Sequence, residues 1–579
     1  MKTIFKHTAS RLCRFLLPVL ALAPLASCSD FLDLKPQNEI TLDKFWNEKS
    51  DVDNVVTGCY SSMQSYDFVG RMMCWGEFRS DNLIGGTNVD NVTSLANIFK
   101  ENINASNDYT SWDAFYNVIN TCNTVLHYAP IVASKDPNYT SSLLNATRAE
   151  VSALRDLCYF YLIRTFRDVP YYTTPYLDDT QDMKLPASKF DAVLDSLIEN
   201  LESVQAYAVK TYPENKKHYQ HGRITQDVIH AMLCDMYLWK QDYANAVRYA
   251  DMVINAKLDE YKKKQNSGSG SSSVLDPLQD GYPLTPDKIS SGYGNAYDEL
   301  FGDGDANESI FELMYDDDNN MLSNTAVSKY YGNATTLPGL VKPADNIASD
   351  MTLDNPKVFL SKNDARYWES IKSAGSNQYA VAKYVYEYIV VNTANDGNSA
   401  VYSNPHPESH CPANWIIYRL TDVMLMKAEA LVQMVDSTSE SPEAKASRDS
   451  LLKEAFSIVK AVNNRYNTAS NKNTLKYDDY SSKALMENLV MDERERELMF
   501  EGKRWFDLVR RSRRDGNTDY LVSKVMQKSS TYASTIQSKL SRMDAIYWPY
   551  NKEELKVNPN LKQNPAFSSG EEDSYHKTN

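Results

Sequence analysis

Residues 491–511 read Met-Asp-Glu-Arg-Glu-Arg-Glu-Leu-Met-Phe-Glu-Gly-Lys-Arg-Trp-Phe-Asp-Leu-Val-Arg-Arg. The stretch combines charged side chains with Leu498, Phe500 and Trp505, so it is too apolar for a solvated run of charges. Its acids and bases recur at three- and four-residue steps, which places them on one face of a helix. Gly502 is typical of a helix end, and a second helix is expected from about Lys503.

Three interpretations fit these charges. They could form two surface helices laced with salt bridges, each pair contributing only about 0.2–0.5 kcal/mol. Glu497 and Glu501 could form a catalytic carboxylate pair, but the neighbouring arginines would hold both side chains ionised. We favour a partly buried charge network that pins the last helices to the body of the protein. Its predicted members are Glu493, Arg496, Glu497, Glu501 and Arg504.

The same stretch resembles the signature of the SusD/RagB family, the surface nutrient-binding lipoproteins that work with TonB-dependent outer-membrane transporters. Three further motifs resemble that family: Ala149–Arg155 with Asp168-Val169-Pro170, Arg419–Ala430, and Tyr547-Trp-Pro-Tyr550 with the residues that follow. The resemblance runs from Cys28 to Pro565. It implies a mostly α fold with a tetratricopeptide-like helical scaffold, a loop-rich variable lobe and a few short strands. It also implies a structural role for the charged motif, and binding rather than catalysis.

The N-terminus has the pattern of an export signal. Basic residues precede the apolar stretch 15–26, which is too short to span a bilayer. Leu25-Ala26-Ser27-Cys28 resembles a bacterial lipobox, in which Cys28 carries the lipid; the alternative is an ordinary signal-peptidase site with a chance cysteine. We predict a signal peptide at 1–27, a lipidated N-terminus and tether at 28–45, and a protein on the extracellular side of the cell outer membrane.

The composition disfavours several classes of partner. A net charge of −15 argues against nucleic acid, whose phosphates need a basic face, and against charge-driven binding to anionic lipid. The chain has eight cysteines but no Cys-x-x-Cys pair, which argues against a zinc or redox framework. Whether any two cysteines form a disulfide stays open at this level.

Periodicity divides the chain into three parts of what we expect to be one body. Helical patterns dominate residues 46–262 and return over 413–579. Residues 148–166 have an amphipathic helical pattern, and Thr225 opens a helical pair whose small facing residues resemble a tetratricopeptide unit. Residues 263–412 are rich in Gly, Asn, Asp, Pro and Tyr, with a strand-like stretch at 307–313. We interpret this middle part as the variable lobe that carries ligand contacts.

Motifs for catalysis and cofactor binding are absent from the sequence. No metalloprotease, nucleophile-elbow, P-loop or dinucleotide-binding pattern occurs, so we predict no enzyme activity and no cofactor. Asp303, Asp305 and Asn307 have the oxygen spacing of a calcium loop, but Glu308 and Met314 stand where such a loop has Gly and Glu. We interpret the segment as a solvated acidic loop, with a structural calcium as the alternative.

The predicted function is capture of a nutrient at the cell surface. A glycan is the expected ligand, because aromatic rings stack on sugar faces with polar groups alongside. The resemblance implies delivery to a SusC-like TonB-dependent transporter, which the protein would cap as a lid. The alternatives are a peptide-binding member of the same family, a secreted glycoside hydrolase on a helical scaffold, and a helical assembly scaffold with no small ligand.

Ligand contacts are expected on loops, because rigid scaffolds usually carry specificity there. Two loop-rich stretches qualify, Trp75–Asn91 and Gly281–Tyr402. The resemblance to the SusD/RagB family implies that a loop after a Ser/Thr-Asp-Glu stretch reaches the ligand. In this sequence Asn82 stands in place of that Glu. The stacking candidates are Trp75, Tyr293, Tyr297, Tyr315, Tyr330, Tyr331 and Trp368, and the hydrogen-bonding candidates are Arg79, Asp81, Asn82, Asn320 and Arg366.

Overall fold

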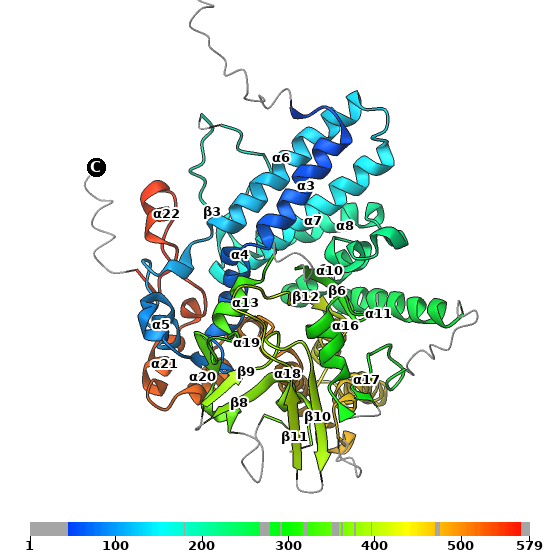
Figure 1. The fold of residues 1–579 in the computed structure, drawn as a ribbon, viewed down its shortest axis with the longest axis vertical. Coiled ribbons are helices and arrows are strands. Elements are labelled where there is room, and N and C mark those ends of the chain that lie inside the picture. Colours follow the sequence, from blue (N-terminus) through cyan, green and yellow to red (C-terminus); the bar gives the residue numbers. More distant parts are fainter. Residues whose placement is uncertain are drawn as a thin grey trace, which may run out of the picture.

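Antiparallel pairs of long helices form the scaffold of the structure (Figure 1). The computed structural model describes residues 45–178, 180–266, 278–289, 292–315, 322–349, 358–359, 363–375, 378–394, 397–468 and 475–568. The predictions for Cys28 and Asn320 lie outside these residues. The helices before residue 267 are α3 (Lys49–Met63), α4 (Tyr66–Met73), α5 (Thr93–Phe99), α6 (Asp113–Lys135), α7 (Ser141–Phe166), α8 (Phe190–Val204), α9 (Tyr219–Gly222), α10 (Gln226–Lys240) and α11 (Tyr243–Asn266).

The helical pair predicted to open at Thr225 is α10 and α11. Thr225 occupies the N-cap position of α10 in an extended conformation, although its side chain makes no capping hydrogen bond. Gln241 ends α10 in the left-handed region, at φ 64°, and turns the chain back so that α11 packs along α10. Neighbouring helices repeat this arrangement: α6 packs on α3 and on α7, and α7 packs on α8.

Helix α7 differs from its predicted one-sided pattern. Nearly all of its residues from Ala149 to Phe166 are buried, because α6, α8 and α10 surround it. Its charged residues are therefore paired inside the protein. Arg155 lies 3.3 Å from Asp156, and Arg164 lies 3.3 Å from Asp235 of α10. The sequence pattern correctly predicted a helix here, but not that it would be buried on all sides.

The C-terminal part returns to helices around the charged motif. Helix α16 packs against α11, α17 and α18, which form a second buried apolar cluster beside the main one. The break predicted at Gly502 separates α18 from α19, with Gly502 at φ 71°. The helices of this part are α16 (Leu420–Gln433), α17 (Pro442–Arg465), α18 (Lys483–Leu498), α19 (Arg504–Asp515), α20 (Asp519–Val525), α21 (Ala533–Leu540) and α22 (Lys552–Val557).

Short helices and most of the strands make up the middle lobe; β1, β2, β3 and β12 belong to the helical parts on either side of it. The helices are α12 (Asn295–Tyr297), α13 (Thr325–Tyr330), α14 (Asp345–Ala348) and α15 (Arg366–Ser370). The strands form small antiparallel sheets in the order β1-β7, β11-β10-β5-β4, β12-β6, β2-β3 and β8-β9. Their bounds are β1 (Leu83–Gly85), β2 (Val169–Pro170), β3 (Ala187–Ser188), β4 (Lys288–Ile289), β5 (Gly292–Tyr293), β6 (Ser309–Leu313), β7 (Val341–Pro343), β8 (Ile371–Gly375), β9 (Gln378–Val381), β10 (Ile389–Ala394), β11 (Gly397–Tyr402) and β12 (Trp415–Arg419).

The main apolar core runs through all three predicted parts of the chain. It extends from Trp46 to Leu561 and includes aromatic residues of the middle lobe, such as Tyr297 and Tyr384. The lobe is therefore packed onto the helices rather than separated from them. Taken together, the helices and short strands confirm the predicted mostly α fold. None of the described helices combines the length and apolar composition that a membrane crossing requires.

Candidate ligand site

The charged motif lies inside the protein rather than at its surface. Glu497 of α18 accepts hydrogen bonds from Arg419 at 2.7 Å and from Arg465 at 2.8 Å, and Arg366 lies 3.3 Å away. Arg419 also pairs with Glu501. Burial alone would raise the pKa of Glu497, but the three arginines hold it well below its usual value. This network joins α15, β12, α17 and α18, and it is more deeply buried than predicted.

The other predicted members of the network are also buried. Arg496 bonds Glu493 at 2.8 Å, and Glu493 in turn accepts a bond from Arg366 at 2.8 Å. Arg504, at the start of α19, pairs with Asp81 at 2.8 Å and with Glu495 at 2.5 Å. Because each carboxylate has an arginine partner, the motif is a structural clamp with no free acid–base pair. Glu497 and Glu501 are both buried and paired with basic residues, so their geometry does not support the alternative of a catalytic carboxylate pair.

The polar ligand candidates near residue 80 belong to the same interior. Arg79 pairs with Glu101 at 2.9 Å and lies 4.3 Å from the ring of Trp505. Asn82 donates to the buried Glu77 at 2.8 Å. Asp81 and Arg366 are likewise buried and paired within the protein, as described above. The prediction that these four side chains face a ligand is therefore wrong.

The aromatic candidates are core residues as well, with one partial exception. Tyr297 donates its hydroxyl to the Ala382 carbonyl, and Trp75 donates its indole N–H to the Tyr109 carbonyl. Trp368 is half-buried and packs edge-on against Tyr367. The rings that are at most 9% exposed are Trp75, Tyr293, Tyr297, Tyr315, Tyr330 and Tyr331. These six rings present no platform to solvent, because they pack in the main apolar core.

The three candidate calcium ligands are separated by other partners. Asp305 lies 2.6 Å from the imidazole of His221. Asn307 accepts hydrogen bonds from Lys257 at its carbonyl and from Lys264 at its side chain. Cationic ammonium groups thus occupy oxygens that a calcium ion would need, and Asp303 does not join them in a cluster. In the described ranges no group of three or more His, Cys, Asp or Glu could hold a metal ion.

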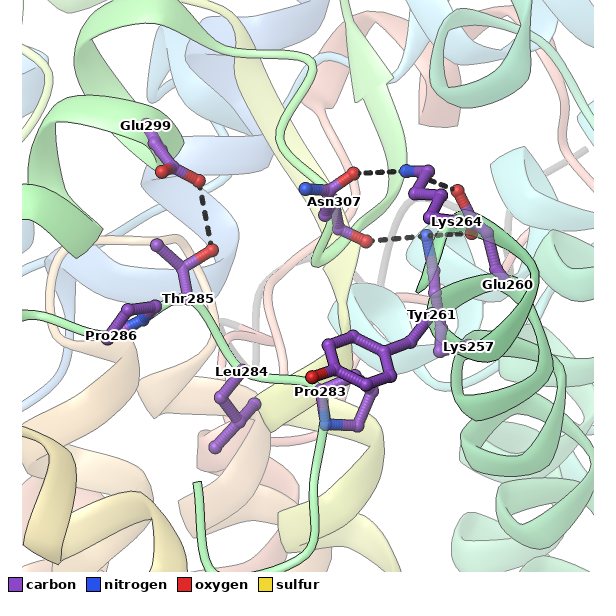
Figure 2. A pocket seen from close by; sticks show the side chains of 10 residues that line it. All are labelled: Lys257, Glu260, Tyr261, Lys264, Pro283, Leu284, Thr285, Pro286, Glu299 and Asn307. Atoms are coloured by element: carbon purple, nitrogen blue, oxygen red, sulfur yellow. Dashed lines mark hydrogen bonds and ion pairs between the residues drawn. The ribbon is translucent and has the colours of Figure 1, made fainter. Parts of the chain in front are cut away.

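These lysines also fill a small pocket between α11 and the segment around Pro283 (Figure 2). Lys264 bridges Glu260 at 2.9 Å and Asn307, while Thr285 bonds Glu299 at 3.0 Å. The polar groups in this pocket are satisfied by one another. A ligand would have to displace those bonds, so we do not assign the site here.

The two loop-rich stretches predicted to carry the ligand meet at a larger cavity of about 520 Å³, which we call the loop pocket. One wall is the loop after β1, and the other is α13 with the loop that follows it. The lining residues are Tyr66, Thr87, Asn88, Asn91, Val92, Thr325, Ser328, Lys329, Asn333, Thr336, Leu340 and Glu408.

Backbone pairing holds the two walls together. Strands β1 and β7 pair antiparallel, with Leu83 opposite Pro343. Beyond β1, the Gly86 N–H donates to the Leu340 carbonyl at 2.8 Å, and the Thr87 N–H donates to the Gly339 carbonyl at 2.9 Å. A Cβ at Gly86 would lie 2.3 Å from the Gly339 oxygen, so only glycine permits this approach. The loop pocket is therefore preformed by the fold.

The side chains of the loop pocket are mainly neutral and polar. Asn88, which is exposed, holds the left-handed conformation at φ 60° that asparagine tolerates. Tyr66 is half-buried, stacks on Tyr330 with centroids 5.8 Å apart, and donates its hydroxyl to that residue at 2.8 Å. Lys329 lies 4.8 Å from the Tyr66 ring centre. The site thus offers amides, hydroxyls and one anchored aromatic ring.

Parts of both predicted loop stretches line the loop pocket but, among the described residues, none of the side chains named from the sequence does. Asn88 and Asn91 fall in the predicted surface loop but were not named as contacts. Tyr66 lies at the start of α4, where nothing in the local pattern separates it from a core tyrosine. Asn333 and Glu408 reach the pocket from positions far apart in the sequence. The signal that could have found the asparagines is their position in a Gly/Asn/Thr turn, which favours exposed amides.

Comparisons with known proteins agree with this fold. A family model described as "SusD family" matches residues 237–567, and another, "Starch-binding associating with outer membrane", matches residues 30–238. SusD-like protein P38 of Formosa agariphila is 24% identical over 572 residues, which cover 95% of this chain and 97% of the relative.

Solved structures are similar over almost the same extent. A SusD superfamily protein of Bacteroides thetaiotaomicron has a TM-score of 0.61 at 18% identity, covering 90% of this chain and 99% of that one. A "Laminarin binding SusD-like protein" has a TM-score of 0.58 at 18% identity, covering 90% of this chain and all of that one (100%). With one family model matching more than half of its length, the chain belongs to the SusD family.

Proposed function

We propose that this protein captures an oligo- or polysaccharide in the loop pocket and delivers it to a TonB-dependent outer-membrane transporter, which it covers as a lid. Its family membership supports glycan binding and association with the outer membrane. The similar structure named for laminarin binding supports the same ligand class. In this proposal the protein is held at the extracellular surface through lipid on Cys28.

The observation that carries the proposal is the chemistry of the loop pocket. Amides and hydroxyls from Thr87, Asn88, Asn91, Thr325 and Thr336 line one cavity. Such groups both donate and accept hydrogen bonds, as sugar hydroxyls require. A cavity of about 520 Å³ falls within the range of small-ligand sites, roughly 300–1,000 Å³.

The charge of the loop pocket favours a neutral ligand that is bound without being cleaved. Lys329 and Glu408 contribute opposite charges, and Glu408 is the only acid among the described residues that line the pocket. Glycoside hydrolysis by the common mechanism needs two carboxyl groups on either side of the scissile bond. The loop pocket supplies one, which supports a role in binding rather than catalysis.

Titration of the purified protein against a glycan panel tests this proposal. The panel contains laminarin and amylopectin, and a hydrolysis assay runs alongside. Asn91→Ala should weaken binding of the recognised glycan about five- to tenfold, because one exposed amide is lost, at about 1 kcal/mol. Asn117→Ala is the matched control, since Asn117 is exposed on α6 and lines none of the pockets described. Equal affinity of both variants and wild type would place the site elsewhere, and release of sugar would reject a binding-only role.

A further inference from the structure

A second cavity, of about 460 Å³, uses the same turn as the loop pocket for one of its walls. The turn is the single 3₁₀ turn Val89–Asn91, held between β1 and α5. Val89 and Asp90 line the second cavity, whereas Asn88 and Asn91 line the loop pocket. We call this second space the Ser530 cavity, after a residue on its opposite wall. The two cavities are therefore neighbours separated by one short segment.

The lining of the Ser530 cavity combines apolar groups with hydroxyls. Ile84, Ala96 and Phe99 are its apolar members, and Phe99 packs on Phe78 with ring centroids 6.1 Å apart. The run Ser529–Tyr532 also lines it, and its four side chains each carry a hydroxyl. Apolar groups and hydroxyls in one cavity suit a sugar ring, which has C–H faces and a polar edge.

One buried polar atom of this cavity lacks a partner in the described part of the chain. The hydroxyls of Ser530 and Thr531 are exposed and open to a ligand. The side-chain oxygen of Asn346 is buried and has no hydrogen-bond partner among the described residues. A buried acceptor without a partner is costly, and a hydroxyl donor from a ligand would satisfy it.

The charged groups around the cavity are already paired. Asp90 lies 3.5 Å from Lys100, and Asp345 lies 3.7 Å from Lys342. Lys528, which is buried, donates to the Arg79 carbonyl at 2.9 Å. With its charges matched, the cavity suits a neutral polyhydroxylated molecule better than an anion or a cation.

We propose that the Ser530 cavity is a second saccharide-binding site, and that one glycan chain occupies both cavities by crossing the Val89–Asn91 turn. The ligand class rests on the proposed function, while the site itself rests on the cavity and on the buried Asn346 oxygen that has no partner among the described residues. Two linked sites raise the affinity for a long chain well beyond that for a short one. A polysaccharide would then be held more tightly than a trisaccharide that fills one cavity.

Plugging each cavity separately tests the inference. Laminaritriose, maltotriose and their parent polysaccharides, laminarin and amylopectin, are titrated calorimetrically onto wild type and three variants. Ser530→Trp blocks the Ser530 cavity, Asn91→Trp blocks the loop pocket, and Ser523→Trp is an exposed control on α20. Wild type and the control should bind two trisaccharides per chain, and each blocked variant should bind one. Ser530→Trp should also lose at least tenfold in affinity for the polysaccharide.

The outcomes separate this inference from the proposed function. Wild-type behaviour of Ser530→Trp, with loss of binding in Asn91→Trp, rejects the second site and leaves the function standing. Failure of wild type to bind any of the four probes rejects both. Thr531→Ala, a smaller change on the same segment, replaces Ser530→Trp if that variant does not fold. It should weaken polysaccharide binding by a similar factor in wild type and in Asn91→Trp, because the glycan occupies the Ser530 cavity in both. A loss in Asn91→Trp without a loss in wild type would overturn the bridging chain.

Discussion

Three guanidinium groups surround the carboxylate of Glu497, which is wholly buried. They come from Arg366, Arg419 and Arg465, at the ends of three different elements. A buried charge is tolerated only when partners replace its hydration. The ionised state of Glu497 is therefore tied to the correct docking of the middle lobe and α17 onto α18. The Glu497 side chain thus contacts arginines from three segments that must come together in the folded protein.

At this scale we predict that Glu497→Ala lowers the free energy of unfolding by about 3–5 kcal/mol, because three arginines lose a buried counter-charge. Thermal melting measures the effect. Glu553→Ala is the control, since Glu553 forms an exposed pair with Lys556 at 2.9 Å and should leave the melting temperature unchanged. If both variants melt with wild type, the network contributes no more than a surface pair.

At the scale of elements, a close backbone contact joins the N-terminal and C-terminal helical parts. Cys74–Phe78 forms a single π-helical turn after α4, and Gly76 in it lies against Gly502, between α18 and α19. Glu77 of the same turn accepts hydrogen bonds from the N–H groups of Lys503 and Arg504, at 3.2 and 3.3 Å. A carboxyl group at this position caps the first turn of α19. The prediction of a loop over Trp75–Asn91 was thus wrong in its first residues.

We predict that Gly76→Ala destabilises the protein by about 1–3 kcal/mol or more, because a Cβ there would lie 1.8 Å from the Gly502 carbonyl oxygen. Chemical denaturation measures the change. Gly58→Ala on α3 is the matched control: a Cβ at Gly58 has no atom within 4 Å, and alanine suits a helix better than glycine. That control should be neutral or slightly stabilising. An equally small effect at Gly76 would mean that the two turns separate easily.

At the scale of the whole molecule, helices and loops have different tasks. The helices bury their apolar faces against one another and against the lobe, so their aromatic residues are mostly core. The loop pocket and the Ser530 cavity lie where loops from distant parts of the chain meet. Such a division lets the loops change ligand contacts without loss of the scaffold.

The proposed lipid anchor also belongs to the scale of the whole molecule. We predict that Cys28→Ala leaves the protein folded but releases it from the membrane fraction, because stable anchoring needs acyl chains on that residue. Detergent partitioning of cells that express each form measures this, with unchanged circular dichroism as the control for folding. A Cys28→Ala protein that stays wholly in the membrane fraction would reject the lipid anchor.

The sequence alone was sufficient for the helices and the family. The three- and four-residue periodicity of α7, α10 and α16 is a local signal, and so is the glycine that separates α18 from α19. The long motif at 491–511 is specific enough to indicate the family, which the family model confirms. These features follow from residues close together in the chain, where pattern and structure are directly linked.

Only the tertiary structure decided which polar and aromatic side chains are exposed to a ligand and which are buried against other parts of the protein. Arg366 looks like a ligand contact in its own segment, but its partner Glu493 lies 127 positions away. Tyr330 lies in a lobe rich in exposed loops, yet it packs on Tyr66 of α4. The loop pocket likewise needs residues from Tyr66 to Glu408. Burial depends on contacts between distant segments, and no local pattern records them, so the sequence determined the scaffold and the fold determined the site.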